Sequence, residues 1–366
     1  MELEIQKLID SVGELDKNAM DAARKRQDEL AKPPGALGRL EDLSIQLAGI
    51  TGKVNNTMDK RALLVFAADN GVVEEGIASC PQSITLMQTI NLTRGKTGAG
   101  TLCKHYGVDL FVCDVGVYTD INCPEVINRK IAYGTKNFTK GPAMTREQAL
   151  KAFLTGVEMV ETYCKDMNVV GIGEMGIGNT TTSAAVLAFL TDSDPEDVTG
   201  KGAGVTEESF THKKECVKKA IEINAPNKDD IINVLSKIGG FDLCAMTGAF
   251  MATAANRIPV VIDGFISVVA ALCAVRMCPN IRHFLIPSHA SFEIGYKIAI
   301  KELELEPMLL LGMRLGEGSG CPLAMHILDC ACTIINEMSD FVHANIDDTF
   351  LDEYRNGDKF TVEGKS

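Results

Sequence analysis

The sequence has no apolar run that reaches the ~20 residues needed to cross a bilayer, so we expect neither a membrane-spanning helix nor a membrane partner. Its N-terminus, Met1 to Gln6, is acidic and amphipathic, which does not fit a signal peptide. Basic residues are in the minority, with 36 lysines and arginines against 49 aspartates and glutamates and a net charge of −13. Because phosphate backbones bind to basic faces, nucleic acid is not an expected partner.

The chain also lacks a Cys-x-x-Cys motif, although it contains 12 cysteines. Most of them stand in apolar surroundings, such as Cys113 and Cys273, where a free thiol behaves as a small hydrophobic side chain. The close pair Cys330 and Cys332 is isolated, so we expect no zinc site. A reduced, cytoplasmic protein is the expectation.

The composition is that of a globular protein with an ample core, because 46% of the 366 residues are hydrophobic and 23% are charged. Short apolar runs that end in polar or glycine-rich tips are typical of buried parallel strands. They cover residues 62–68, 108–112, 169–172, 258–262, 284–286 and 308–313. Helical patterns lie between them, at 84–105, 145–166, 180–190, 208–224, 242–256, 265–277 and 293–304.

Strands that alternate with helices predict an α/β fold, in which a parallel sheet with right-handed crossovers carries helices on both faces. Ligands of such sheets bind at the carboxyl ends of the strands, where these polar tips meet. We expect residues 60–305 to form this large domain. Residues 1–59 with 306–345 form a small helical domain that carries Glu317, and residues 346–366 form a flexible tail.

Glu317 is the first candidate for chemistry. It lies in the stretch 313–320, between Gly316 and Gly318. Glycines let the main chain approach a ligand closely, and Arg314 offers a fixed cation suited to a phosphate or carboxylate. The alternative is a turn that leads into a helix and carries a solvated glutamate.

Residues 171–182 are the second candidate, because they follow a strand and open a helix whose free N–H groups can bind an anion. Asn179 and Thr180 add side-chain donors. The stretch lacks the Gly-Lys-Thr/Ser of a Walker loop and the setting of a dinucleotide fingerprint. We interpret it as a phosphate site, with an ordinary strand-to-helix loop as the alternative. His289 has no nucleophile elbow or evident triad partner, so a structural role is favoured over a general base.

Six motifs, taken together and in order, resemble those of nicotinate-nucleotide:dimethylbenzimidazole phosphoribosyltransferases, which activate the lower-ligand base of cobamides. Each motif is weak alone, but six in order over residues 30–345 are specific. The resemblance implies a Rossmann-like, mostly parallel sheet and a homodimer. The motifs cover residues 32–41, 68–72, 171–181, 239–242, 261–265 and 314–320.

The resemblance also implies the reaction, in which nicotinate mononucleotide and an aromatic base give an α-riboside 5′-phosphate and nicotinate. Glu317 matches the family's catalytic base, and one carboxylate suffices to take the proton of the incoming base. Neither a cofactor nor a metal is expected, because the leaving pyridinium is already cationic and no pyrophosphate departs. Positions that match the phosphate and ribose contacts are Gly176, Asn179, Thr180, Gly202, Lys213, Ser291, Arg314 and Gly316. Those that match the base pocket are Cys80, Gln88, Glu174, Met175 and Leu315.

Two positions depart from the family's pattern and leave the identity of the base open. Asn70 replaces a histidine of some members, and Cys80 stands where a hydroxyl is expected. Phenol or p-cresol is therefore an alternative acceptor, with a heterodimer of two similar subunits as the alternative assembly. A non-catalytic nucleotide-binding subunit and a flavodoxin-like or dehydrogenase-type redox protein are further alternatives. The presence of Glu317 argues against the first, and the missing N-terminal dinucleotide fingerprint argues against the second.

Overall fold

A six-stranded parallel β-sheet forms the centre of the computed structural model, which describes residues 1–202, 204 and 206–351. Its strands follow the spatial order β3-β2-β1-β4-β5-β6. They are β1 (Arg61–Ala68), β2 (Asp109–Gly116), β3 (Val126–Asn128), β4 (Val169–Met175), β5 (Val260–Ile262) and β6 (Leu285–Pro287). The chain builds outward from β1 to β3 and then returns to place β4 on the other side of β1. The β1–β4 junction is therefore the point where the strand order reverses, and ligands bind at such a point in open α/β sheets.

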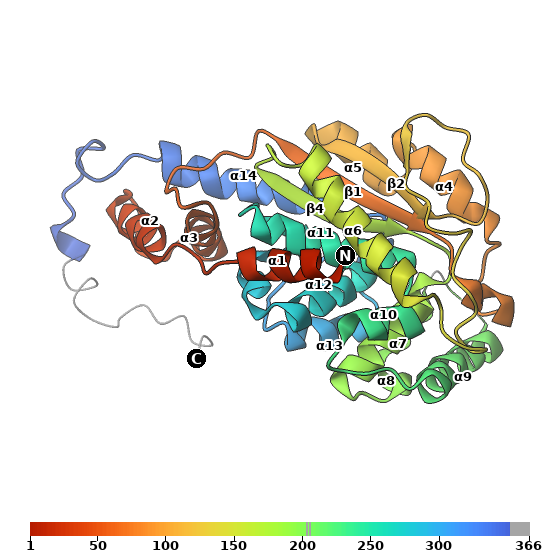
Figure 1. Cartoon of the computed structure of the whole chain (residues 1–366). Coiled ribbons are helices and arrows are strands. Elements are labelled where there is room, and N and C mark those ends of the chain that lie inside the picture. The colour runs from red at the N-terminus through yellow and green to blue at the C-terminus, as the bar shows by residue number, and fades with distance from the viewer. Residues whose placement is uncertain (203, 205, 352–366) are drawn as a thin grey trace. The chain divides into compact units, whose positions relative to one another are not determined.

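Helices cover both faces of the sheet. In Figure 1, α4 (Ser83–Thr93) and α5 (Gly98–Tyr106) pack against β2 on one face. On the other face lie α6 (Arg146–Tyr163), α11 (Phe241–Ala255) and α12 (Phe265–Met277). Because both faces are covered, residues 62–68 of β1 are fully buried and read as a continuous apolar run. The predicted fold class is confirmed.

The remaining helices complete the outer layers and the chain ends. None of the helices in the described part of the chain is long and apolar enough to cross a membrane. The α-helices are α1 (Glu2–Ser11), α2 (Lys17–Glu29), α3 (Arg39–Thr51), α7 (Asn179–Thr191), α8 (Pro195–Val198), α9 (Glu207–Asn224), α10 (Ile231–Ile238), α13 (Ile294–Glu302) and α14 (Cys321–Glu337). The 3-10 helices are η1 (Gly71–Glu75), η2 (Pro279–Phe284) and η3 (Thr349–Leu351).

The predicted strand at 308–313 is wrong. This stretch lies beside the segment that follows β6, where the carbonyl of Leu309 accepts the N–H of Ala290 at 2.8 Å. Its apolar side chains are not in the core, since Leu310 is 84% exposed and Leu311 57%. An apolar run alone does not distinguish a buried strand from an exposed connection. The short edge strand β3 was not predicted.

One predicted helix is interrupted. The pattern at 84–105 divides into α4 and α5, with Gly95 at φ 64° between them. The left-handed Gly95 follows the end of α4, while the apolar periodicity continues across it into α5. The hydrophobic pattern therefore does not show this break in the helix.

The chain forms two compact units, which differ from the predicted domains. Among the described residues, the larger comprises residues 1–13 and 60–325, and the smaller comprises residues 14–59 and 326–351. The Glu317 segment thus belongs to the larger unit, because its backbone and side chain bond to residues of the α/β region. Helix α1 also packs there, against α11. Residues 352–366 of the predicted tail lie outside the described residues.

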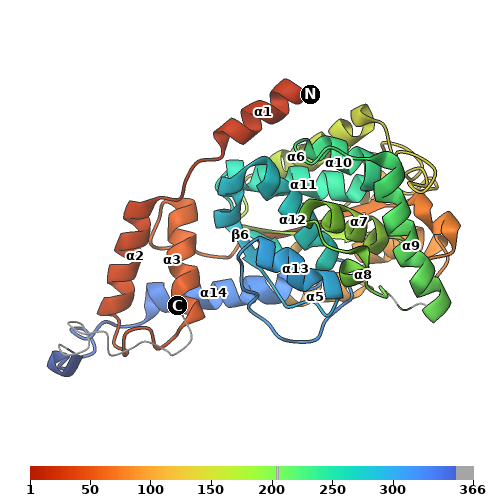
Figure 2. The ribbon, with the colours of Figure 1, turned by 90° about the horizontal axis from the view of Figure 1, so that it is seen from below.

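The smaller unit contains a helical core of its own. Helices α2 and α3 lie side by side in Figure 2, and Ala23 and Ala48 pack together with Ile335. A buried ion pair joins Lys32 to Glu41 at 2.8 Å in the turn that carries the two prolines.

Candidate functional site

A cavity of about 580 Å³ opens at the carboxyl ends of the strands, where β4 ends in Glu174 and Met175. Every residue that the sequence predicted to contact substrate or act as base lines this cavity. The structure thus brings together segments that are distant in sequence. These residues are Cys80, Gln88, Glu174, Met175, Gly176, Asn179, Thr180, Gly202, Lys213, Ser291, Arg314, Leu315, Gly316 and Glu317.

Glu317 lies in a strained loop at the wall of the cavity. Its backbone is left-handed, with φ 63°, and its neighbours Gly316 and Gly318 have φ 89° and 81°. This conformation is uncommon for a residue with a side chain, and such residues gather at functional sites. The carboxylate is buried, and its Oε2 accepts the N–H of Ala99 at 3.0 Å, in the first turn of α5. The positive end of the helix dipole favours a carboxylate at that place.

Asp263, at the tip of β5, holds the Glu317 loop from below. Its Oδ2 accepts the N–H of Gly318 at 3.0 Å, and its Oδ1 accepts the N–H of Gly320 at 2.7 Å. Burial raises the pKa of Asp263, whereas these backbone donors act in the opposite direction. Both carboxylate oxygens therefore serve to fix the backbone on either side of Ser319.

The glycines of the loop allow the strand to come unusually close. A Cβ on Gly173 of β4 would lie 2.6 Å from backbone atoms of Gly318. A Cβ on Gly316 would lie 2.5 Å from Oε1 of Glu174. A side chain at Gly173 would push the backbone next to Glu317 away from the sheet, and one at Gly316 would displace the carboxyl group of Glu174.

Glu174 and Asp242 form a buried acidic pair beneath the cavity. Nδ2 of Asn179 donates to Oε2 of Glu174 and, at 3.1 Å, to Oδ2 of Asp242. The other oxygen of Glu174 accepts the N–H of Glu317 at 3.4 Å. Burial raises the pKa of Glu174 to about 8, and the nearby charges of Asp242 and Asp263 act in the same direction. Glu174 is therefore largely protonated at neutral pH.

Lys213 provides a buried cation in a part of the cavity wall that we call the anion end. It lies on α9, and its Nζ donates to Thr180 Oγ1 at 2.8 Å and to the carbonyl of Gly200 at 2.9 Å. Burial lowers the pKa of Lys213 to about 8, although Glu293 acts in the opposite direction. Thr180 lies in the first turn of α7, so a cation and a helix N-terminus meet here. Together they offer a site for an anion.

Two charged side chains flank Lys213. Arg314 is exposed, and its Nη1 donates to the carbonyl of Gly202 at 3.2 Å. Glu293 is buried, and its pKa is raised by that burial, while Lys213 and Arg314 act to lower it. The anion end of the cavity thus contains the cations Lys213 and Arg314 and the carboxylate of Glu293, and Lys201, which pairs with Glu207, also lines the cavity.

The other end of the cavity is more apolar. Met175, Leu315 and Cys80 line it together with Ile77 and Ile84. An aromatic ring would find apolar contacts here, next to the carboxylate of Glu317.

His289 lines the cavity, but it is held for a structural role. Its Nδ1 lies 2.9 Å from Ser288 Oγ, and burial lowers its pKa to about 4. The ring is therefore neutral at physiological pH. Asn70, expected near the base pocket, is fully buried at the tip of β1 and is not among the lining residues.

Comparison with known proteins identifies the family. A family model described as phosphoribosyltransferase matches residues 12–346. The chain belongs to this phosphoribosyltransferase family. It is 49% identical to the nicotinate-nucleotide–dimethylbenzimidazole phosphoribosyltransferase of Clostridium perfringens, over 98% of this chain and 99% of that one. The Ruminiclostridium cellulolyticum enzyme of the same name is 51% identical, over 93% and 97% of the two chains.

Solved structures agree with this phosphoribosyltransferase assignment. A crystal structure of the enzyme of that name from Thermus thermophilus superposes with a TM-score of 0.86 at 36% identity. It covers 91% of this chain and 99% of its own. The family resemblance and the Rossmann-like fold predicted from the motifs are both confirmed.

The phosphoribosyltransferase site contains charged residues that were not predicted as part of it. Asp242, Asp263 and Glu293 surround the predicted residues, although none of them was assigned a contact. A signal was available for Asp263, because it ends an apolar strand in an Asp-Gly tip. No local pattern marks Glu293, which reaches Lys213 only in the folded chain.

Proposed function

We propose that this protein transfers the phosphoribosyl group of nicotinate mononucleotide to 5,6-dimethylbenzimidazole or a related aromatic base. The products are an α-riboside 5′-phosphate, which serves the nucleotide loop of a cobamide, and nicotinate. One observation carries the proposal: a single cavity is lined both by the cations Lys213 and Arg314 and by the Glu317 carboxylate with apolar side chains around it. The names of relatives about half identical to this chain support the same reaction.

The two ends of the cavity give the substrates their orientation. The 5′-phosphate fits the anion end, where Lys213, Arg314 and the first turn of α7 provide donors and positive charge. The acceptor ring fits the apolar end, against Met175 and Leu315. The ribose then lies between them, with C1′ facing the acceptor nitrogen.

Glu317 is the proposed base. The attacking nitrogen forms a bond to C1′ while the bond from C1′ to the nicotinate nitrogen breaks, and the bonding electrons neutralise the pyridinium. The acceptor's N–H proton passes to Glu317, so the leaving group needs no acid. Attack opposite the leaving group converts a β-glycosidic bond into an α-glycosidic one.

Glu174 is less suited to this role than Glu317. Its carboxyl group already accepts from Asn179 and from the Glu317 N–H, and its pKa is raised to about 8. A carboxyl group that is protonated at neutral pH cannot take a proton.

The assay that tests this function is incubation of the purified protein with nicotinate mononucleotide and separate acceptors. The panel contains benzimidazoles, purines, phenol and p-cresol, and the products are identified by mass. We expect a riboside phosphate of 5,6-dimethylbenzimidazole and an equal amount of nicotinate. Products from phenols alone would replace this acceptor assignment, and no product from any acceptor would contradict the proposed activity.

We further propose that the active form is a homodimer located in the cytoplasm. All 12 cysteines are free, which suits a reducing compartment. Phe292, Leu310 and Leu311 have exposed apolar side chains, and they belong to the segment after β6 and to the stretch 308–313 that pairs with it. They offer a surface for a second copy.

A further inference from the structure

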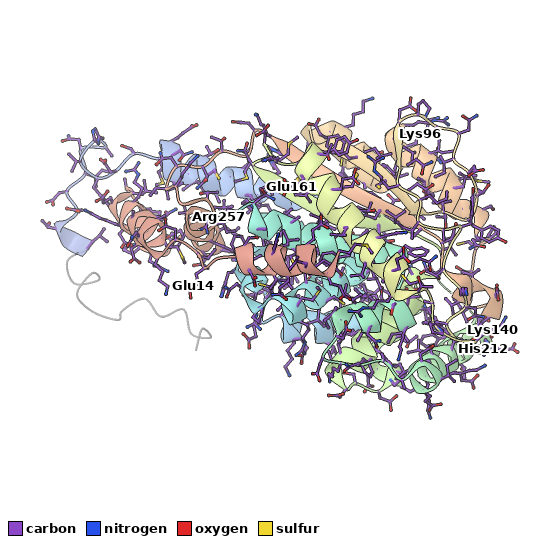
Figure 3. The ribbon with its side chains drawn as sticks, in the orientation of Figure 1. Glu14, Lys96, Lys140, Glu161, His212 and Arg257 are labelled. Carbon is purple, nitrogen blue, oxygen red and sulfur yellow. The ribbon has the colours of Figure 1, made fainter. Side chains whose placement is uncertain are left out.

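Two potential metal ligands lie on one face of α9. His212 and Cys216 are four residues apart, which places them one above the other on a helix. Cys216 Sγ lies 3.6 Å from His212 Nε2. Figure 3 shows His212 at the outer edge of the molecule, close to Lys140.

A third ligand comes from η1. Oε2 of Glu75 lies 3.6 Å from His212 Nε2, and one ligand atom from each of Glu75, His212 and Cys216 lies within 4.8 Å of the other two. We call these three residues the α9 cluster. They are not among the residues that line the substrate cavity.

The spacing of the α9 cluster is close to that around a tetrahedral zinc ion. Bonds of about 2.3 Å to sulfur and about 2.0–2.1 Å to nitrogen place those two atoms about 3.6 Å apart. Bonds to nitrogen and oxygen place them about 3.3 Å apart. The observed separations of 3.6 Å for the first pair and 3.6 Å for the second need only a small adjustment.

Glu75 and His212 each contact further residues through the atom that does not face the cluster, as metal ligands in proteins usually do. Nδ1 of His212 lies 3.2 Å from Oε2 of Glu215, which keeps Nε2 available toward the cluster. Oε1 of Glu75 accepts from Asn137 Nδ2 at 2.6 Å and from Thr139 Oγ1 at 2.8 Å, which leaves Oε2 for the cluster. These contacts orient the ligands before any ion is bound.

We propose that Glu75, His212 and Cys216 bind one divalent cation of the zinc class, with a water in the fourth position. A glutamate, a neutral imidazole and a thiolate supply two negative charges, which balance the ion. His212 is partly exposed, so solvent can reach the open position. Binding forms a metal–sulfur bond and releases the thiol proton to solvent. The bound ion stabilises the thiolate that remains.

The ion would tie α9 to the segment after β1. Glu75 closes η1, while Asn137 and Thr139 belong to the connection before α6, so three distant segments meet at this point. Lys213 is the residue next to His212 and points from a different side of the helix. We therefore assign the ion a role in holding α9 in place and no role in the reaction.

Cobalt titration of the full-length protein tests this proposal. After treatment with a chelator, we expect one Co²⁺ per chain, with a thiolate-to-cobalt charge-transfer band and the visible bands of tetrahedral cobalt. Cys216→Ser should abolish the charge-transfer band. His212→Gln, at a partly exposed position, should remove tetrahedral binding without a risk to folding. Glu215→Gln should weaken affinity by about 10- to 100-fold.

Two variants serve as matched controls. Cys330→Ser removes an exposed thiol, and His343→Gln removes an exposed histidine that contacts Asp340 at 2.8 Å. Both should bind Co²⁺ as the wild type does. Zn²⁺ should displace the cobalt and raise the melting temperature of the wild type and both controls, but not of His212→Gln. A wild type without the charge-transfer band, or a band that persists in Cys216→Ser, would overturn the proposal.

Discussion

Oε2 of Glu317 accepts the N–H of Ala99 at 3.0 Å, so the proposed base is bonded to the first turn of α5. This bond fixes one carboxylate oxygen and leaves the other to face the acceptor. The left-handed backbone of Glu317 places the side chain there at a cost in strain.

Glu317→Gln should lower kcat by about 10²- to 10⁴-fold, because the amide keeps the shape but cannot take a proton. Nucleotide affinity should change little. Steady-state kinetics and calorimetry with nicotinate mononucleotide measure the two effects. With a phenol as acceptor the loss should be at least as large, since a phenol is a poor nucleophile until it is deprotonated.

Glu174→Gln is the matched control for that variant. Because the pKa of Glu174 is raised to about 8, the substitution removes little negative charge, although the glutamine NH₂ group then faces either Asn179 Nδ2 or the Glu317 N–H. Its kcat should therefore fall much less than that of Glu317→Gln. The reverse order, with Glu317→Gln near the wild-type rate, would assign the base to Glu174 or to a bound water.

Asp263→Asn should lower kcat more than it changes KM for the nucleotide. The asparagine keeps one acceptor for the amides of Gly318 and Gly320 but turns an NH₂ group toward the other, so the loop that carries Glu317 loses its support. One unsatisfied buried donor costs about 1–3 kcal/mol of stability. Chemical denaturation gives the stability change, and kinetics give the rest. A less stable variant with wild-type kcat would limit Asp263 to a structural role.

The location of the site could be predicted from the sequence because polar residues follow the apolar runs and mark the ends of the strands. The tips at Glu174, Asp263 and His289 follow apolar runs, and parallel strands bring their carboxyl ends to one edge. The run at 308–313 has the same pattern, yet Leu310 and Leu311 are exposed in a connection beside the segment after β6. Local hydrophobicity does not report which surface covers a segment, and that depends on the rest of the fold.

Contacts between residues that are distant in the sequence could not be predicted in the same way. Ala99 bonds to Glu317 through a backbone N–H, which leaves no mark on the sequence. In the α9 cluster, the His212–Cys216 spacing could have been noticed, but Glu75 reaches it only through tertiary structure. The proposed ligand set contains a single cysteine, so no pair of cysteines marks it in the sequence.

Lys213→Ala should mainly raise KM for nicotinate mononucleotide. The lysine is the buried cation at the proposed phosphate end, and a charge-assisted hydrogen bond contributes about 1.5–3 kcal/mol, or roughly 10- to 100-fold in Kd. Lys214→Ala is the control, since Lys214 is the next residue on α9 and pairs with Glu196 on the surface. Unchanged nucleotide binding of Lys213→Ala in calorimetry would rule out this role.

Sedimentation should show a particle twice the 39.4 kDa mass of the chain at micromolar concentration. Leu310 is 84% exposed and Phe292 76%, and a second copy would remove them from water. Leu310→Glu should shift the equilibrium toward the monomer. The control Lys301→Glu, which reverses the charge at an exposed position on α13, should not. A wild-type particle of 39.4 kDa would contradict the homodimer.

Finally, the stability of the ligand-free protein should fall as pH rises from about 5 to 8. Burial raises the pKa of Glu174 from 4.5 to about 8, so between these values the folded protein binds a proton that the unfolded chain has released. The contribution is fully present below the lower pKa and is lost through the higher one, with a slope of at most about 1.4 kcal/mol per pH unit.

Glu174→Gln removes this group and should flatten the curve of unfolding free energy against pH. Asp242 and Asp263, whose pKa values burial also raises, retain the rest of the slope, while His289, whose pKa burial lowers to about 4, opposes it below about pH 6.5. Glu222→Gln changes one carboxylate on α9 outside the cavity and is the control. Urea denaturation at each pH measures the slopes, and equal slopes for the wild type and Glu174→Gln would show that Glu174 is ionised throughout this range.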